Sequence, residues 1–82
     1  MARVTFSKAG LEALGRKYAE AVLQDVNLSP ESMPLLIESK EWAEATPLLR
    51  KSVCDAIREN ARRELLNAGF PAEKINQVIK RG

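Results

Sequence analysis

The residues of this chain whose types and spacing could do chemistry are its charged side chains, 13 basic and 11 acidic among 82 residues. Arg58, Arg62 and Arg63 fall within two turns of one predicted helix, where guanidinium groups could hold a small anionic ligand between subunits. Asp55 and Glu59 lie within one turn of these arginines and partly neutralise them. The pattern therefore favours a solvated helix face over a track for phosphates.

The residue types that most enzymes depend on are missing or scarce. The sequence has no histidine, the commonest general base and metal ligand, and its one cysteine is Cys54. This combination excludes ordinary zinc sites. The sequence contains no glycine-rich phosphate loop and no nucleophile elbow. We therefore expect a protein that is not an enzyme and that uses no cofactor and no metal.

Length and composition predict a single helical domain over residues 1–82. Hydrophobic residues make up 45% and charged residues 29% of the chain, as in ordinary globular proteins. A chain of this size buries only about 60% of the surface that it exposes when unfolded, so it builds one modest core. We expect it to fold alone or as a small oligomer.

Cysteine usage and hydropathy indicate where the protein works. Cys54 has no second cysteine to pair with, which indicates a reducing cytoplasm, and we expect it to be a buried structural thiol. No apolar run approaches the roughly 20 residues that span a bilayer, and the opening MARVTFSKAG lacks the apolar region of a secretory signal. The net charge of +2 is too small to indicate nucleic acid by itself. These features predict a soluble cytoplasmic protein without membrane contact.

The elements that position the side chains are all predicted to be helices. Ser7 is a good N-cap, and Phe6 before it can pack back onto the first turn as a hydrophobic staple. The helix is expected to run to about Val26. Its apolar stripe is Leu11, Leu14, Tyr18, Val22 and Val26. Gly10 and Gly15 either allow another helix to approach closely or are tolerated surface glycines.

The segment that follows contains three of the four prolines and predicts short elements. Residues 29–32 are interpreted as a turn. Ser32 is expected to cap a short helix that runs to about Glu38, with a proline tolerated in its first turn. Ser39 is expected to restart or continue the helix as far as Ala45.

The longest helix begins at Thr46-Pro47, an N-cap followed by proline at the first helical position, and runs to about Ala68. Gly69 can end it in a left-handed conformation, with Phe70 folding back on the last turn, as in a Schellman motif. Its apolar arc is about 180° wide at 100° per residue. The arc consists of Leu49, Val53, Cys54, Ala56, Ile57, Ala61, Leu65 and Ala68. The fold predicted is an all-α bundle of four to five helices around this central helix, residues 47–68.

Four residues of the long helix do not fit the arc. Asn60 and Glu64 project into its apolar middle and need polar partners, in this chain or in a second one. Leu48 and Leu66 lie on its polar side and could mark a dimer or target surface. Alternatively, the bundle wraps further round the helix than the wheel assumes.

Trp42 allows two interpretations as well, because a lone Trp beside apolar residues is most often part of the core but is also a common anchor for a partner. The predicted protein interface consists of Trp42, Leu48, Arg58, Asn60, Arg62, Glu64 and Leu66.

The last helix is predicted from Pro71 to about Arg81, with Ile75, Val78 and Ile79 on one face. It closes the bundle in the simplest interpretation. The stretch LLNAGFPAEKINQVIKRG also resembles the turn and recognition helix of the helix-turn-helix family, with Gly69 in the turn. That resemblance implies base readout and phosphate contacts in DNA. The residues assigned to these contacts are Asn76, Gln77, Lys80 and Arg81.

The leading hypothesis for function is a small non-catalytic module that binds another protein as a regulator, inhibitor or adaptor. We expect it to self-associate through the long helix as a homodimer or higher homo-oligomer. Short basic chains of this kind are frequent among phage and mobile-element accessory proteins. The alternative is a helix-turn-helix-like DNA-binding transcriptional regulator that uses residues 65–81, and the third hypothesis is oligomeric sequestration of a small anionic ligand.

Overall fold

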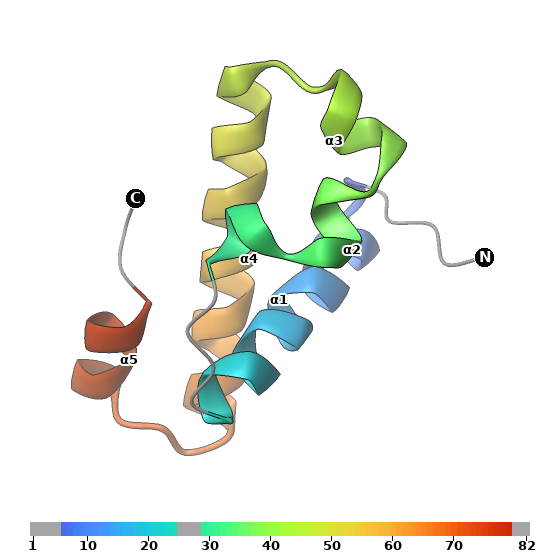
Figure 1. Ribbon diagram of the computed structural model, residues 1–82. Coiled ribbons are helices and arrows are strands. Elements are labelled where there is room, and N and C mark those ends of the chain that lie inside the picture. The colour runs from blue at the N-terminus through green and yellow to red at the C-terminus, as the bar shows by residue number, and fades with distance from the viewer. Residues whose placement is uncertain (1–5, 25–28, 80–82) are drawn as a thin grey trace.

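The computed structural model describes residues 6–24 and 29–79. Within them the chain forms five α-helices and one 3-10 helix and contains no strand (Figure 1). The elements are α1 (Lys8–Leu23), η1 (Pro30–Ser32), α2 (Pro34–Ile37), α3 (Lys40–Glu44), α4 (Pro47–Asn67) and α5 (Ala72–Val78). The predicted all-α bundle around a long central helix is confirmed.

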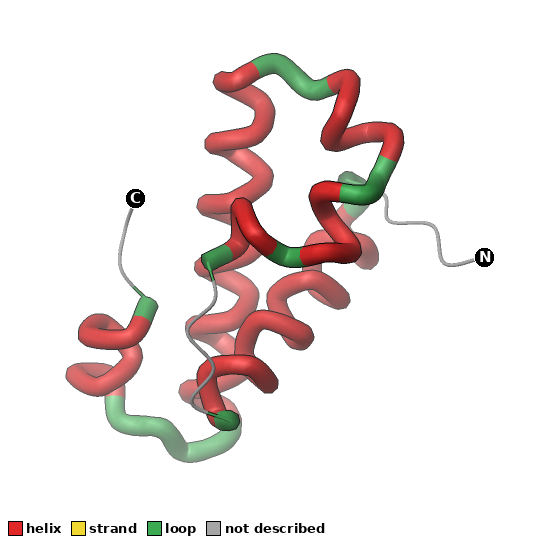
Figure 2. Tube along the Cα trace, viewed as in Figure 1, coloured by secondary structure: helices red, strands yellow, loops and turns green. Residues whose placement is uncertain are grey.

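The architecture is a pair of crossing helices, α1 and α4, with smaller elements on either side. The elements η1, α2 and α3 form an arch that leads to the start of α4 (Figure 1). After α4 the chain turns back, and α5 lies beside the carboxyl-terminal half of the long helix. Figure 2 shows that short loops join the elements from η1 to α5. The long helix therefore contacts several neighbours, as its wide apolar arc predicts.

The crossing of α1 and α4 depends on Gly15. A Cβ atom at this position would overlap the Cβ of Asn60 and would lie 3.1 Å from the backbone nitrogen of Ala61. Gly15 is itself buried. Of the two interpretations of this glycine, close approach of another helix is therefore the correct one.

The first helix begins as the sequence predicts. The side chain of Ser7 accepts the backbone N–H of Gly10 at 3.2 Å. Phe6, the residue predicted to form a staple, and Leu11 both pack against the core. The backbone N–H of Phe6 also donates to the Glu41 carboxylate at 2.9 Å, which ties the start of α1 to α3.

The arch differs from its prediction by one residue. The helix α2 begins at Pro34 with Met33 as its N-cap, instead of with Ser32. The reason is that the Ser32 hydroxyl is engaged with η1: it accepts the backbone N–H of Ser29 at 3.3 Å and donates to the carbonyl of the same residue at 3.0 Å. Ser39 caps α3, so the helix restarts there.

Both ends of α4 follow local signals in the sequence. The Thr46 side chain accepts a backbone N–H of the first turn at 3.1 Å. At the other end Gly69 has a φ of +89°. The backbone N–H of Phe70 donates to the carbonyl of Leu65 at 2.9 Å, and that of Gly69 to the carbonyl of Leu66 at 3.0 Å. This pair of hydrogen bonds is the predicted Schellman motif.

The core lies between α1 and α4 and is closed by the arch and by α5. Its buried hydrophobic residues are Leu14, Tyr18, Ala19, Met33, Leu36, Trp42, Val53, Cys54, Ile57, Ala61, Leu65, Ile75 and Ile79. The first helix ends at Leu23, and the predicted end at Val26 lies outside the described residues.

The last helix is shorter than predicted. Ile75 and Ile79 are buried as expected, but Val78 is exposed. The helix α5 ends at Val78, and the backbone of its C-cap, Ile79, leaves the helical region with φ −102° and ψ 87°.

Candidate functional site

One side of the long helix, here called the outer face of α4, faces solvent along its whole length. Its exposed residues are Leu48, Lys51, Ser52, Asp55, Glu59, Arg63 and Leu66. At 100° per residue they occupy about 120° of the helix surface. Leu48 is 76% exposed and Leu66 is 48% exposed, so both leucines point away from the core as the helical pattern predicts. The outer face therefore presents two apolar ends and a charged middle.

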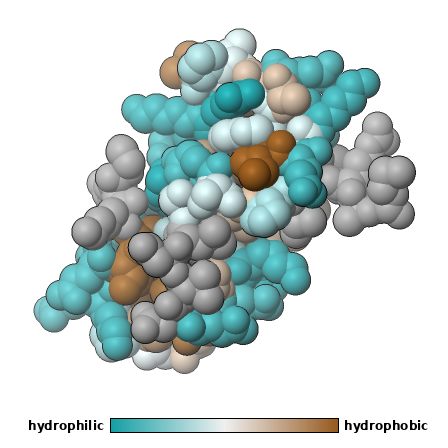
Figure 3. Space-filling view, in the orientation of Figure 1, coloured by the Kyte–Doolittle hydropathy of each residue, from teal (hydrophilic) through white to brown (hydrophobic). Residues whose placement is uncertain are grey.

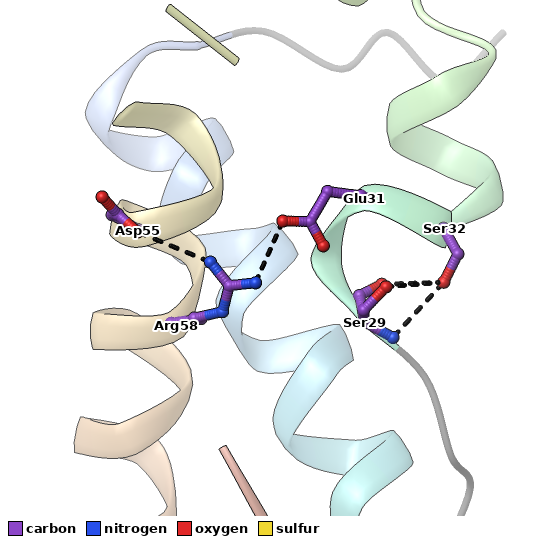
Figure 4. A network of polar contacts seen from close by, with 5 residues as sticks. All are labelled: Ser29, Glu31, Ser32, Asp55 and Arg58. Carbon is purple, nitrogen blue, oxygen red and sulfur yellow. Dashed lines mark hydrogen bonds and ion pairs between the residues drawn. The ribbon is translucent and has the colours of Figure 1, made fainter. Parts of the chain in front are cut away.

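Arg58 differs from its prediction, because η1 covers it. The residue is only 8% exposed. Its guanidinium donates to Glu31 at 3.0 Å and to Asp55 at 3.4 Å, and Figure 4 shows it lying between the two carboxylates. The sequence pattern predicts a side chain on a solvated face. Arg58 instead holds η1 against α4, so an external partner does not meet its guanidinium directly.

The cluster around Arg58 affects its acidic neighbours. Partial burial raises the pKa of Glu31, but hydrogen bonding of the carboxylate to its own backbone and to Arg58 outweighs this, and the net pKa is lower than 4.5. Burial, followed by the negative charge of Glu31, raises the pKa of the Cys54 thiol from 9.0 to about 12. Burial also raises the pKa of Tyr18, although the positive charge of Arg58 opposes this. The arrangement keeps Glu31 charged and Cys54 neutral near neutral pH, which is typical of a structural cluster.

Arg62 lies one turn beyond Arg58 and contacts α5. Its guanidinium donates to the side-chain oxygen of Asn76 and lies 3.8 Å from the Glu59 carboxylate. The Nε atoms of both arginines make no hydrogen bond but are buried, so a ligand in solvent cannot reach them. These intramolecular contacts leave Arg63 as the exposed arginine of the trio assigned to anion sequestration.

Trp42 belongs to the core and not to an exposed anchor site. Trp42 is only 9% exposed. The Arg50 guanidinium lies over the indole ring, 4.9 Å from its centroid, and donates two hydrogen bonds to the Trp42 carbonyl, at 2.9 Å and 3.1 Å. Such a cation–π contact stabilises the junction between α3 and α4. Of the two interpretations of Trp42, the structure supports the core.

Asn60 and Glu64 both contact α1 of the same chain. The Cβ of Asn60 packs against the α1 backbone at Gly15. Glu64 is exposed, and its carboxylate lies 3.9 Å from the Arg16 guanidinium of α1. Neither residue lies in a dry part of the core, because α1 crosses α4 at this level and leaves these side chains at the edge of the crossing.

One of the residues that the helix-turn-helix resemblance assigns to base contacts is already engaged within the chain. Asn76 and Gln77 are exposed on α5, but the side-chain oxygen of Asn76 accepts from Arg62. Asn76 would have to break this contact to read a base edge bidentately. Lys80 and Arg81 lie outside the described residues.

Neither a metal site nor a membrane-crossing helix is found in the described residues. No group of three or more His, Cys, Asp or Glu side chains among residues 6–24 and 29–79 could hold a metal ion. In the same residues, none of the helices combines the length and apolarity that a membrane crossing requires. Among the described residues on the side of the molecule drawn in Figure 3, hydrophobic ones form separate patches in a largely hydrophilic surface.

Comparison with known proteins gives no relative: no family model, no curated protein and no solved structure matches this chain. The site therefore has to be interpreted from its own geometry. Two of the residues predicted for the interface, Leu48 and Leu66, lie on the outer face of α4. Three others, Trp42, Arg58 and Arg62, mainly make contacts within the chain.

Proposed function

We propose that this protein is a small non-catalytic binding module that acts as a regulator, inhibitor or adaptor by presenting the outer face of α4 to another protein chain. The observation that carries the proposal is the exposure of Leu48, 76%, together with that of Leu66, 48%, on one side of a single helix. The two leucines do not form a contiguous patch, but each offers a partner an exposed apolar contact point on the same face of the helix.

The geometry of α4 suits this role. Leu48 and Leu66 are 18 positions apart, which is about five helical turns and about 27 Å at 1.5 Å per residue. The helix is held from behind by α1, by the arch and by α5, so its outer face does not have to be ordered when a partner binds. Preorganisation of this kind lowers the entropic cost of association.

The competing hypothesis of DNA binding has less support in the side-chain contacts. Of its two base-reading residues, Asn76 and Gln77, the first is engaged with Arg62. The partner favoured here is therefore a protein, either a different chain or a second copy. Which of the two fits the outer face depends on its charges.

Affinity capture from the cells that make this protein tests the proposal. The tagged wild type is compared with a Leu48→Glu, Leu66→Glu double variant, whose folding circular dichroism verifies. We expect the wild type to retain one stoichiometric partner protein and the double variant to lose it. If both proteins retain the same partner, the binding site does not lie on the outer face.

A further inference from the structure

The charges on the outer face of α4 follow a symmetric order along the helix. Between the two leucines the sequence of charged residues is Lys51, Asp55, Glu59 and Arg63, that is, positive, negative, negative, positive. The midpoint of the leucine pair is Ile57, since 48 and 66 are equally distant from 57. The charged pairs have the same midpoint, because 55 and 59 are each two positions from it and 51 and 63 are each six.

This symmetry determines what a second copy would meet. An antiparallel pairing that brings Leu48 of one copy onto Leu66 of the other also brings Asp55 onto Glu59 and Lys51 onto Arg63. A parallel pairing places every residue on its own equivalent. Like charges meet in both symmetric arrangements, and like-charge contacts at an interface are a recognised means of excluding a wrong partner.

The acidic middle of the face keeps its charge in spite of the neighbouring arginines. Asp55 and Glu59 have side chains that are 57% and 61% exposed, so each can be reached by a partner. Arg58 and Arg62, their partners in ion pairs, are largely covered, with 10% and 18% of their side chains exposed. Counting Glu31, three carboxylates share two guanidiniums here, which leaves one net negative charge.

We infer that the outer face binds an amphipathic helix of a different protein, an inference that rests on the proposed function. The partner helix carries two Lys or Arg residues at its centre, acidic residues on either side of them and an apolar residue near each end. The centre of such a helix meets Asp55 and Glu59, and its acidic residues meet Lys51 and Arg63. The apolar residues stand about 27 Å apart, matching Leu48 and Leu66. A different chain replaces the homodimer that the sequence pattern predicts through the same helix.

Two alanine-rich helical peptides of identical composition test the inference. Both carry leucines at the spacing of Leu48 and Leu66. One has its lysines at the centre and its glutamates on either side, and the other has the reverse order. Fluorescence anisotropy at low salt should give tighter binding of the lysine-centred peptide, on the order of tenfold for four exposed ion pairs. The preference should shrink at high salt.

Variants of the protein supply the controls. The double variant Asp55→Lys, Glu59→Lys should abolish the preference, because each peptide then makes two favourable and two unfavourable charge contacts. Glu20→Lys, the same type of charge change at an exposed position of α1, should leave the preference unchanged. Equal binding of the two peptides by the wild type, a preference for the glutamate-centred one, or no binding of either would overturn the inference. The proposed function is tested separately: it fails if the wild type captures no partner protein, or if the Leu48→Glu, Leu66→Glu variant still captures it.

Light scattering provides an independent readout. We expect the wild type to be a monomer, and Asp55→Lys to promote dimers, because the new lysine meets Glu59 of the other copy twice. A wild-type dimer that Leu66→Glu dissociates would show that the face does pair with itself and would contradict the inference.

Discussion

Gly15 of α1 and Asn60 of α4 touch so closely that no side-chain atom fits on the glycine: a Cβ there would overlap the Cβ of Asn60. This contact fixes where the two main helices cross. It also sets which side of α4 faces inward, and therefore which side is left as the outer face.

Replacing this glycine should destabilise the protein. Alanine is the better helix former by up to about 1 kcal/mol, yet the overlap at the crossing should cost about 1–3 kcal/mol, so we expect a net loss for Gly15→Ala. Denaturant unfolding measures it. A double-mutant cycle with Asn60→Gly, which removes the opposing Cβ, should show favourable coupling between the two sites. Purely additive effects would mean that the helices do not cross at this point.

The ion pair between Arg58 and Glu31 should make stability depend on pH. The folded-state pKa of Glu31 lies below its ordinary value of 4.5, so the pair contributes stability above about that pH and loses it as the pH falls through the lower folded value. We expect Glu31→Gln to cost on the order of 1 kcal/mol at pH 7, because the Glu31 side chain is half exposed.

The difference between wild type and Glu31→Gln should vanish in acid. Thermal unfolding at a series of pH values from 7 downward measures this. A difference that is the same at all pH values would indicate that Glu31 contributes through packing and not through its charge.

Cys54 should react slowly with thiol reagents in the folded protein, since its side chain is buried and its thiol pKa is raised to about 12. The same shift predicts that stability falls as the pH rises above 9.0, because the unfolded thiol ionises there and the folded one does not. Labelling kinetics with and without denaturant provide the first check. Rapid stoichiometric labelling of the native protein would place Cys54 on the wrong side of α4.

The last helix should be sensitive at its apolar positions and insensitive at its polar ones. Ile75→Ala and Ile79→Ala remove buried side chains and should each cost about 2–5 kcal/mol. Gln77→Ala, on an exposed residue of the same helix, is the matched control and should cost little. Tight, salt-sensitive duplex DNA binding that Asn76→Ala abolishes would instead support the helix-turn-helix resemblance.

Local signals made much of this fold predictable. The N-caps at Ser7 and Thr46 and the left-handed Gly69 act within one helical turn, so the sequence alone locates the start of α1 and both ends of α4. The outward direction of Leu48 and Leu66 follows from helical periodicity in the same way.

The contacts that the sequence could not indicate join residues far apart in the chain. Arg58 and Glu31 are separated by 27 positions, and Arg62 and Asn76 by 14. A helical wheel places Arg58 at the border of the polar side, but only the path of η1 over that border buries it. For the same reason the sequence alone suggests an exposed arginine cluster, whereas in the structure Arg58 and Arg62 are held by contacts with Glu31 and Asn76.

The most direct test of the account is site-specific photo-crosslinking from the outer face of α4. A photoreactive amino acid is placed at position 48 or 66 and, as a control, at the exposed position 17 of α1, and the protein is irradiated in the cells that make it. If a different protein binds the outer face, positions 48 and 66 both yield an adduct with the same single protein, different from this chain, and position 17 yields none. An adduct from position 17 as strong as those from α4, or adducts only between copies of this chain, would contradict the account.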